Sequence, residues 1–271
     1  MMPGVANVVW DRETAEHYDS TSAEMFLPEV LGPCVDVLAA LAGAGAALEF
    51  AIGTGRVGLP LSDRGVPVSG IELSPDMAGV LRGKPGAAAV PVTVGDMASV
   101  RVPGVFTLVY LVFNTIMNVT TQDEQVAVFA NAAAHLGTGG RFVVEVGVPA
   151  ISGLPAAELG RVFDISAGHV GIDTLDDPVG QIMSSHHLTL IDGRWVRNSM
   201  PFRYVWPSEL DLMARLTGFR LEHRWAGWDR APFSASTTSQ VAVYEKVSLE
   251  PETASDGRGS RRGGRRVRTR V

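Results

Sequence analysis

The stretch from Leu48 to Gly58 constrains the fold of this chain more than any other. It reads Leu-Glu-Phe-Ala-Ile-Gly-Thr-Gly-Arg-Val-Gly, an apolar run that meets glycines where a strand would end, and a helical pattern can start at Leu59. Strand, glycine turn and helix are typical of a nucleotide-type cofactor site, because glycine allows positive φ and has no Cβ to hold a ligand away. The free N–H groups of the helix N-terminus then face polar or anionic ligand atoms.

The length and composition suit one α/β domain with an insertion. The chain has 271 residues, of which 46% are apolar and 19% charged. Its single cysteine, Cys34, excludes an internal disulfide and a cysteine-cluster metal site, so we expect a buried thiol and no metal. We see no signal-peptide pattern and no run near the ~20 apolar residues that span a bilayer. These features predict a cytoplasmic protein without membrane contact.

The net charge of -6 hides an asymmetry between the body and the C-terminal segment. Residues 248–271 hold seven of the 23 basic and three of the 29 acidic residues, which leaves 16 basic and 26 acidic residues, a balance of -10, for the body. An acidic body argues against a nucleic-acid footprint over the fold. The Arg-rich segment has almost no apolar content, and we expect it to be a disordered, solvated tail; weak attraction to nucleic acid or acidic surfaces is the alternative.

Strands alternate with helices through the first half of the chain, which predicts a parallel, doubly wound α/β sheet. Two helices are expected first, at 11–31 with a break near 20–22, and at 35–41. The expected strands are 47–51, 66–71, 90–94, 106–112 and 141–146, and the helices between them are 57–62, 75–82 and 122–136. Ser74 and Pro75 should begin the second of these helices as N-cap and first-turn residue.

The pattern changes after Pro149. We expect residues 150–180 to be irregular, because they are rich in Gly, Pro and Asp. Segments 181–190 and 195–204 flank Ile191-Asp-Gly-Arg194 and predict an antiparallel hairpin. A helix at 207–216 and strands at 219–225 and 240–247 complete the chain. We therefore predict one domain over 1–247, with a hairpin insertion at about 180–205 and the tail at 248–271.

The glycine turn alone does not identify its cofactor. Gly53 to Gly58 matches G-x-G-x-x-G, and Glu72 follows Gly53 by 19 residues, so a dinucleotide would fit equally well. Glu49, however, lies on the strand itself, where a dinucleotide site carries apolar residues, and its carboxylate could meet a ligand ammonium group. Glu72 is placed to accept two ribose hydroxyls. Asp96 and Met97, after the third strand, suit the amino group and the face of an adenine.

With these residues in view, the chain resembles the class I S-adenosylmethionine-dependent methyltransferases. Four segments resemble their successive motifs: Leu48–Gly58, Gly70–Met77, Gly95–Met97 and Leu111–Asn114. The motifs cover about residues 45–147, and the topology extends the resemblance to about 247. The family implies a Rossmann-like sheet of seven strands, the last antiparallel. An NAD(P)-dependent oxidoreductase, the alternative, would carry a Tyr-x-x-x-Lys pair that this chain lacks.

The resemblance assigns the cofactor residues by position. Glu49, Gly53 and Gly55 should hold the amino-acid end of S-adenosyl-L-methionine, and Glu72 its ribose. The remaining cofactor positions are Asp96 and Met97 around adenine, Val112, Phe113 and Asn114 along the methionine portion, and Ala51, Leu73 and Met77 in the same motifs. Structural alternatives remain open for three of them: an ion pair of Glu49 with Arg56, a helix-capping role for Glu72, and a core position for Met97.

The implied reaction is displacement at a sulfonium methyl by a nitrogen, oxygen or carbon nucleophile, which releases S-adenosyl-L-homocysteine. Positioning supplies much of the catalysis, and a base helps only where the nucleophile must lose a proton. The candidate catalytic residues are Tyr18 as a lid over the pocket, Asn118 after the fourth strand, Glu145 at the end of the fifth, and His186 and His187. These two histidines point to opposite faces of one strand, so one of them is a candidate base or binder, and ordinary hairpin positions are the alternative.

The Tyr18-Asp19 segment, Phe113-Asn-Thr-Ile-Met-Asn118 and the hairpin together resemble the amino-sugar N-methyltransferases of natural-product pathways. Those enzymes tend to carry His at the position of Asn118, and Asn cannot act as a base, so this chain departs from their mechanism. We expect a small-molecule acceptor in secondary metabolism and no nucleic-acid substrate. A non-catalytic cofactor-binding regulatory protein is the second class left open. The aromatic segment 201–207 should pack the insertion on the sheet, with a homodimer surface as the alternative.

Overall fold

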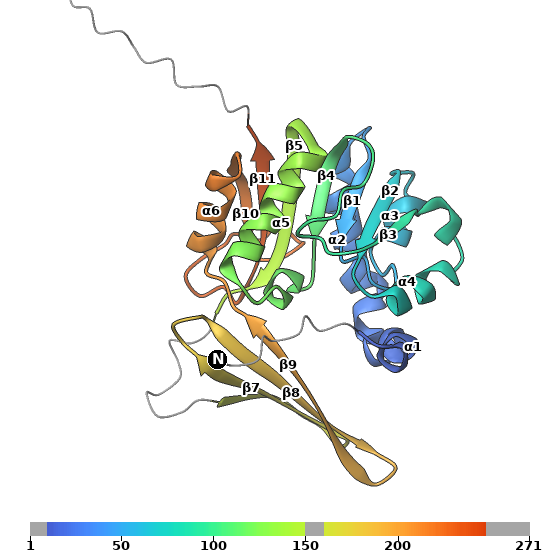
Figure 1. Cartoon of the computed structure of the whole chain (residues 1–271), viewed down its shortest axis with the longest axis vertical. Coiled ribbons are helices and arrows are strands. Elements are labelled where there is room, and N and C mark those ends of the chain that lie inside the picture. The colour runs from blue at the N-terminus through green and yellow to red at the C-terminus, as the bar shows by residue number, and fades with distance from the viewer. Residues whose placement is uncertain (1–9, 150–159, 248–271) are drawn as a thin grey trace, which may run out of the picture.

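The computed structural model describes residues 10–149 and 160–247, which form a large mixed sheet and a smaller antiparallel sheet (Figure 1). The large sheet has seven strands in the order β10-β11-β5-β4-β1-β2-β3. Its strands are β1 (Ala47–Phe50), β2 (Val68–Glu72), β3 (Val92–Val94), β4 (Phe106–Leu111), β5 (Leu136–Gly147), β10 (Phe219–Trp225) and β11 (Ser239–Lys246). Strands β1 to β5 run parallel, and β11 lies antiparallel between β5 and β10. The predicted seven-stranded Rossmann-like sheet with an antiparallel last strand is confirmed.

Helices cover both faces of the large sheet, because its central strands are apolar on both sides. All four residues of β1 are buried, and in β4 only Thr107 is exposed. Two helices, α5 (Gln122–His135) and α6 (Pro207–Leu216), pack on one face, where Phe129 and Leu210 are buried against Phe142. The other face is covered by α2 (Pro28–Ala42) and α3 (Gly58–Asp63). The short elements are α1 (Arg12–Thr21), α4 (Pro75–Arg82), and the 3-10 turns η1 (Ala23–Phe26), η2 (Ala87–Ala89) and η3 (Thr115–Asn118).

Local signals placed several boundaries correctly. Helix α4 begins at Pro75, and the Ser74 hydroxyl accepts a hydrogen bond of 3.2 Å from the Met77 N–H, as an N-cap should. The break predicted near residues 20–22 is present, because α1 ends at Thr21. The predicted start of the second helix at residue 35 was wrong, since α2 already begins at Pro28. Gly32 and Pro33 inside α2 resemble helix breakers, yet burial of Leu31, Val35 and Leu38 keeps this segment helical.

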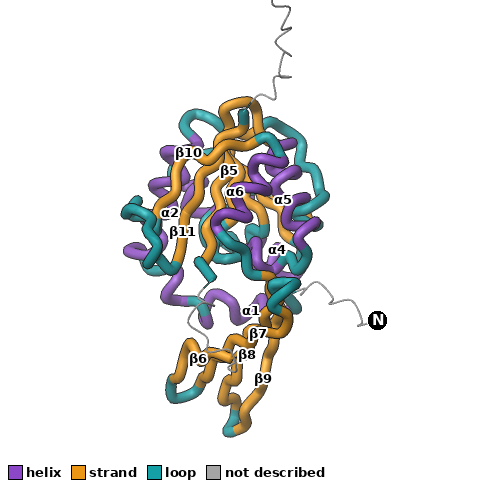
Figure 2. Tube along the Cα trace, turned by 90° about the vertical axis from the view of Figure 1, so that its left-hand side faces the viewer, coloured by secondary structure: helices purple, strands orange, loops and turns teal. Residues whose placement is uncertain are grey.

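The insertion is a four-stranded antiparallel sheet in the order β6-β7-β8-β9, projecting from one end of the large sheet (Figure 2). Its strands are β6 (Gly160–Ile165), β7 (His169–Asp177), β8 (Ile182–Ile191) and β9 (Arg194–Arg203). The predicted hairpin of β8 and β9 is present, with Asp192 and Gly193 at positive φ in its turn. Of residues 150–180, which were expected to be irregular, 150–159 lie outside the described residues, and the expectation was wrong for 160–165 and 169–177. Those residues are extended because β7 pairs along most of its length with β8.

A buried polar group fastens the insertion sheet to the helices of the large sheet. The Arg203 guanidinium, 4% exposed, ion-pairs with Glu209 at 2.6 Å and donates to the Gln181 side-chain oxygen at 2.7 Å and the Gln125 side-chain oxygen at 2.5 Å. Arg203 ends β9, Gln125 lies on α5, and Glu209 lies in the first turn of α6. Arg203, in the segment 201–207, therefore fastens the insertion to α5 and α6 through polar contacts rather than through the aromatic packing that was predicted.

Within the described ranges, 10–149 and 160–247, no helix combines the length and apolarity needed to cross a bilayer. The predicted tail, 248–271, lies outside the described residues, and the division into a 1–247 domain and a tail stays a prediction.

Candidate functional site

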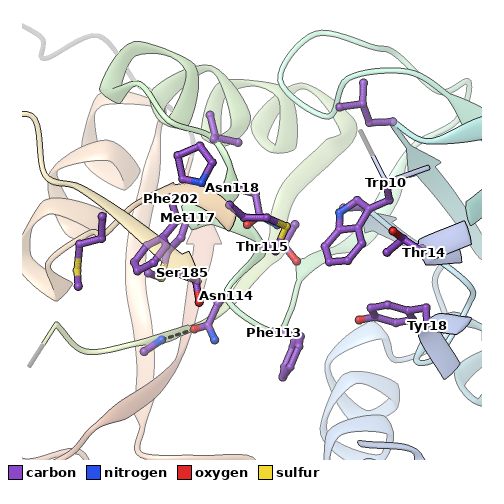
Figure 3. A pocket seen from close by; sticks show the side chains of 18 of the residues that line it. Trp10, Thr14, Tyr18, Phe113, Asn114, Thr115, Met117, Asn118, Ser185 and Phe202 are labelled. Atoms are coloured by element: carbon purple, nitrogen blue, oxygen red, sulfur yellow. Dashed lines mark hydrogen bonds between the residues drawn. The ribbon is translucent and has the colours of Figure 1, made fainter. Parts of the chain in front are cut away.

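A cavity of about 1080 Å³ opens where the carboxyl ends of the parallel strands face the insertion sheet. The large sheet contributes residues that follow β1, β2, β3, β4 and β5, and α1 and the insertion sheet close the remaining sides. Figure 3 shows Trp10, Thr14 and Tyr18 on one side of this cavity, with Asn114, Met117, Asn118, Ser185 and Phe202 on the other. This is the edge at which open parallel sheets bind ligands.

The glycine turn bends sharply at the end of β1 to open the cavity. Ala51, Gly53 and Gly55 all have positive φ, at 52°, 58° and 84°. Gly58 serves packing instead: a Cβ there would lie 2.7 Å from the Glu49 carboxylate and 2.8 Å from Ile52. Ala51 and Gly53 line the cavity, whereas Gly55 does not. The turn thus presents its backbone to a ligand and lets α3 sit close to β1.

Glu72 fixes the glycine turn from the end of β2. Its carboxylate accepts the Gly53 N–H at 2.7 Å and the Ser74 N–H at 2.8 Å, and it also lines the cavity. Burial raises the pKa of Glu72, and the hydrogen bonds from the Ser74 and Gly53 N–H groups act in the opposite direction. Glu72 therefore both supports the turn and offers acceptor oxygens at the cavity wall. In this geometry Glu72 can bond to the Ser74 N–H at the start of α4 and also contact a cofactor, so the two roles are compatible.

Asp96 and Met97 form the neighbouring part of the wall. One Asp96 oxygen accepts the Ala98 N–H at 2.8 Å, and Met97 belongs to the apolar core while lining the cavity. Leu73 and Met77 complete this wall. A carboxylate beside apolar side chains is the combination expected for an adenine site.

The loop after β4 is held in an unusual backbone conformation. Phe113 and Asn114 both have left-handed φ, at 56° and 62°. Glu145 supports them: its carboxylate accepts the Phe113 N–H at 2.9 Å and the Trp228 indole N–H at 2.7 Å. The Asn114 side-chain oxygen accepts the Gly147 N–H at 2.6 Å. Glu145 thus holds the loop in place from outside the cavity wall.

Helix α1 lies over the cofactor side of the cavity and is fastened to the glycine turn. The Thr54 hydroxyl donates to Asp19 at 2.6 Å, and Asp19 also ion-pairs with Lys84. Tyr18 packs edge-on against Trp10, with ring centroids 5.7 Å apart, and both rings line the cavity. Burial raises the pKa of the Tyr18 hydroxyl, so it stays protonated at neutral pH. This placement suits the predicted lid.

The insertion sheet forms the opposite wall with alternate residues of its strands, because successive side chains of a strand point to opposite faces. His187 therefore lines the cavity and His186 does not; the two imidazoles bond to different partners, His169 for the former and Ser199 for the latter. The wall residues of the three longest strands are His169 and Asp173 of β7, Met183, Ser185, His187 and Thr189 of β8, and Asn198, Met200, Pro201 and Phe202 of β9.

Twelve of the predicted site residues line the cavity and five do not. Those in the wall are Tyr18, Ala51, Gly53, Glu72, Leu73, Met77, Asp96, Met97, Phe113, Asn114, Asn118 and His187. Those outside it are Glu49, Gly55, Val112, Glu145 and His186. The roles of all of them stay predictions.

Glu49 lies beneath the glycine turn rather than in the wall. It is 2% exposed, accepts the Tyr110 hydroxyl at 2.9 Å, and has no ion pair with Arg56 within 4.0 Å in the described part of the chain. Burial raises the pKa of Glu49 to about 8, since a charged carboxylate is poorly solvated there. The structure thus places under the turn a carboxyl group whose neutral form is favoured by burial.

Sequence reasoning missed several wall residues. Trp10, Thr14, Arg161, Asp173 and Ser185 line the cavity and were not singled out. For Asp173 and Ser185 the missed signal was the period-2 pattern of β7 and β8. Trp10 has no such local signal, since its position depends on a contact between its carbonyl oxygen and the Ser74 hydroxyl, at 2.5 Å.

Comparison with known proteins agrees with this geometry. A family model described as a methyltransferase domain matches residues 47–140. The solved CcbJ methyltransferase from Streptomyces caelestis is 31% identical to this chain, with a TM-score of 0.80 over 90% of this chain and 100% of that one. Among curated proteins no significant match was found.

Two more distant structures share the fold. CalS10 bound to S-adenosylmethionine, an amino pentose methyltransferase from Micromonospora echinaspora, is 19% identical with a TM-score of 0.65, over 89% of this chain and 99% of that one. The sugar N-methyltransferase KedS8 from a Streptoalloteichus species is 20% identical with a TM-score of 0.59, over 90% of this chain and 98% of that one.

Proposed function

Because this chain belongs to the class I S-adenosylmethionine-dependent methyltransferases, we propose that it methylates a nitrogen or oxygen atom of a small molecule, and that nitrogen is the preferred target. The methyl donor is S-adenosylmethionine, and the chain is an enzyme. The oxidoreductase and the non-catalytic binding protein considered from the sequence are therefore set aside.

The residues on the glycine-turn side of the cavity, which we call the donor half, fit S-adenosylmethionine. Glu72 offers carboxylate oxygens suited to ribose hydroxyls, and Asp96 with Met97 offers an acceptor beside an apolar surface for adenine. Gly53 brings the backbone to the cavity without a side chain. When bound, S-adenosylmethionine supplies a methyl group already activated on a sulfonium. The protein then has to hold the acceptor in line, exclude water and remove a proton where the acceptor carries one.

The small-molecule proposal rests on the part of the cavity next to the insertion sheet, which we call the acceptor half. Its shape and its lining residues carry the proposal. The insertion sheet closes the cavity opposite the glycine turn, so the acceptor is surrounded by side chains rather than laid on an open surface. A volume of about 1080 Å³ lies slightly above the ≈ 300–1,000 Å³ usual for a single small-ligand pocket, which suits a donor and an acceptor together. A polymer would need an open groove and a basic track.

The charges of the wall support a nitrogen acceptor. Acidic side chains prevail: Glu72, Asp96, Glu124 and Asp173 line the cavity with Arg161 as their basic counterpart. Asp173 is the acidic group of the insertion sheet in this wall, and its carboxylate is suited to an ammonium group. The amino pentose and sugar N-methyltransferase names of the two distant neighbours are consistent with this choice.

For the residues of the acceptor half we propose separate roles. Tyr18 covers the pocket from α1, and Asn118 offers hydrogen bonds without acting as a base. His187 is the group placed to accept a proton. We assign Glu145 to positioning the loop after β4, since both of its oxygens are engaged there, and we give His186 no part in the chemistry.

Calorimetry followed by a turnover screen tests the proposal. We expect S-adenosylhomocysteine to bind and NADH not to bind. Release of S-adenosylhomocysteine from the donor should then be measured with primary amines, secondary amines, hydroxyl compounds and RNA as candidate acceptors. Turnover with an amine supports the proposal. Transfer to RNA or to a protein, with none to any small molecule, would overturn it.

A further inference from the structure

A chain of four polar side chains runs through the insertion sheet from the cavity wall toward solvent. Ser185 Oγ lies 3.2 Å from His187 Nε2, and His187 Nδ1 lies 3.0 Å from His169 Nε2. His169 Nδ1 in turn lies 2.6 Å from an Asp164 carboxylate oxygen. Ser185, His187 and His169 line the cavity, whereas the Asp164 side chain is 44% exposed. This row of hydrogen-bonded side chains thus connects the acceptor half of the cavity to water.

Hydrogen-bonding chemistry gives this chain a direction. An ionised Asp164 can only accept, so His169 carries its proton on Nδ1. A neutral His169 then has a lone pair on Nε2, and it accepts from the Nδ1–H of His187. His187 is left with a lone pair on Nε2, at the cavity wall beside Ser185. When both histidines are neutral, these hydrogen bonds therefore leave His187 Nε2 as a basic nitrogen at the cavity wall.

The surroundings of His187 are built around its ring. Gly171 lies opposite His187 in the β7–β8 pairing, and a Cβ on Gly171 would lie 2.3 Å from the Phe163 ring. The missing side chain makes room for Phe163, which packs edge-on against His187 with centroids 5.5 Å apart. Burial lowers the pKa of His187, so the imidazole is neutral and able to accept a proton near pH 7.

We propose that His187 Nε2 takes the proton of the bound acceptor and that His169 and Asp164 carry the resulting charge away from the cavity. The inference deepens the proposed function and rests on it. For an ammonium acceptor, one N–H bond breaks, its electron pair stays on nitrogen as the nucleophile, and the proton bonds to His187 Nε2. The Nδ1 proton of His187 passes to His169 Nε2, and the imidazolium formed there lies against Asp164. No other reactant is needed.

This assignment also accounts for a departure noted in the sequence. The loop after β4 carries Asn118, which cannot accept a proton as a base does, so the base must come from elsewhere in the wall. His187 and His169 are the histidines lining the cavity within residues 10–149 and 160–247. His187 is the catalytic base in this scheme, and His169 and Asp164 are positioning residues that act through it.

The first test compares the two adjacent histidines of β8. His187→Gln should lower kcat by about 10²–10⁴, the usual contribution of a general base. His186→Gln is the matched control, because His186 points to the other face and bonds to Ser199 and Thr174; its kcat should stay within about twofold. A His187→Gln enzyme with kcat within about threefold of wild type would overturn the proposal while leaving the methyltransferase function intact.

The second test uses the pH profile of kcat, which a purely structural role would not shift. The charged groups around the pair are Asp164, Asp173, Arg161 and His186. Asp164→Asn removes the anion that favours the imidazolium, so the apparent pKa of the pair should fall by about one unit or more, and the acidic limb of the profile should move to lower pH. Asp164→Glu should restore the limb. A lower kcat with an unmoved limb would contradict a relay through Asp164.

The third test does not depend on activity. In ¹⁵N NMR spectra of the whole protein at pH 8, His187 and His169 should both carry their proton on Nδ1. In His169→Leu, the His187 tautomer should shift toward the Nε2-protonated form, because leucine leaves the His187 Nδ1–H without its acceptor. An Nε2-protonated His187 in the wild-type protein would overturn the relay. If instead the tautomers are as predicted but no acceptor is methylated, the proposed function fails and the hydrogen-bonded chain stands.

Discussion

The two sheets of this protein serve one cavity in different ways. In the large sheet, β1 is buried along its whole length and β4 at every position but Thr107, and the cavity begins only where these strands end. In the insertion sheet, β8 and β9 are half-buried or exposed along almost their whole length, and their side chains form the wall directly. The large sheet thus places a backbone turn, whereas the insertion sheet displays side chains.

This difference explains why the two halves suit different ligands. A turn whose shape depends on glycine φ angles and a buried carboxylate tolerates little change, and it serves a donor that is the same for every member of the family. A wall of alternate side chains on a thin sheet can change residue by residue. We therefore expect the acceptor to be determined by β7, β8 and β9, and the following predictions test that separation.

The largest effect is expected in the donor half. Glu72→Ala should raise the Kd for S-adenosylhomocysteine at least 100-fold, because it removes an acceptor from the wall and releases the Gly53 and Ser74 N–H groups. Each charge-assisted hydrogen bond contributes about 1.5–3 kcal/mol. Calorimetry measures the change, with Glu29→Gln, exposed on α2, as the control. An unchanged Kd would show that the ribose assignment is wrong.

Next comes the junction between the two sheets. Arg203→Ala should lower the free energy of unfolding by about 3–5 kcal/mol, because it removes the buried guanidinium and leaves the partly buried Glu209 carboxylate and two glutamine side chains without their partner. Urea denaturation measures this loss, and Arg197→Ala, exposed on the same strand, should change stability by less than about 0.5 kcal/mol. The folded Arg203→Ala protein should still bind S-adenosylhomocysteine within about threefold of wild type. A large loss of cofactor affinity would show that the two halves are not separable.

A smaller effect is expected where α1 is fastened over the donor half. Asp19→Asn weakens the bond from Thr54 and removes the ion pair with Lys84. A hydrogen bond to a charged group contributes about 1.5–3 kcal/mol, so the dissociation rate of S-adenosylhomocysteine should rise about tenfold, as stopped-flow fluorescence of Trp10 would report. Glu16→Gln, exposed on the same helix, is the control and should leave the rate unchanged. Equal rates for Asp19→Asn and wild type would show that the attachment of α1 does not control release of the cofactor product.

Counted per pH unit, the smallest effect concerns the buried carboxyl group of Glu49 under the turn. The pKa of Glu49 is raised from its usual 4.5 to about 8, so between these values the folded protein holds a proton that the unfolded chain has lost. Wild-type stability should therefore fall as pH rises through this window, by at most about 1.4 kcal/mol per pH unit. Glu49→Gln should remove that slope in urea denaturation, whereas Glu24→Gln, on the exposed turn η1, should keep it. Equal slopes for wild type and Glu49→Gln would mean that Glu49 is ionised in the folded protein.

The large sheet could be predicted because its signals are local. The glycines mark the end of β1, Ser74 and Pro75 mark the start of α4, and the apolar run of β4 shows that it is buried on both faces. Strands β6 and β7 could not be predicted in the same way. Their residues include Gly171, Asp173 and Asp177, and they are extended because each strand pairs with the next one along the chain, β6 with β7 and β7 with β8.

The site divides similarly. The motif positions correctly predicted that Glu72, Asp96 and Met97 lie in the cavity wall. Whether other candidate side chains point into the cavity depends on contacts with residues far away in the sequence. Glu145 points away from the cavity because the Phe113 N–H and the Trp228 indole hold its carboxylate. The sequence showed that His186 and His187 face opposite ways; only the register of β8 shows which of the two faces the cavity.

The alternation of the insertion wall has a consequence for how the acceptor range can evolve or be engineered. Positions 183, 185, 187 and 189 of β8 and 198, 200 and 202 of β9 reach the cavity, whereas most of the residues between them point to the other face. A combinatorial library confined to these positions would sample new acceptors while the main-chain hydrogen bonds of both strands stay in place. Leaving position 187 out of that library would keep the proposed proton path intact, so that selection acts on fit alone.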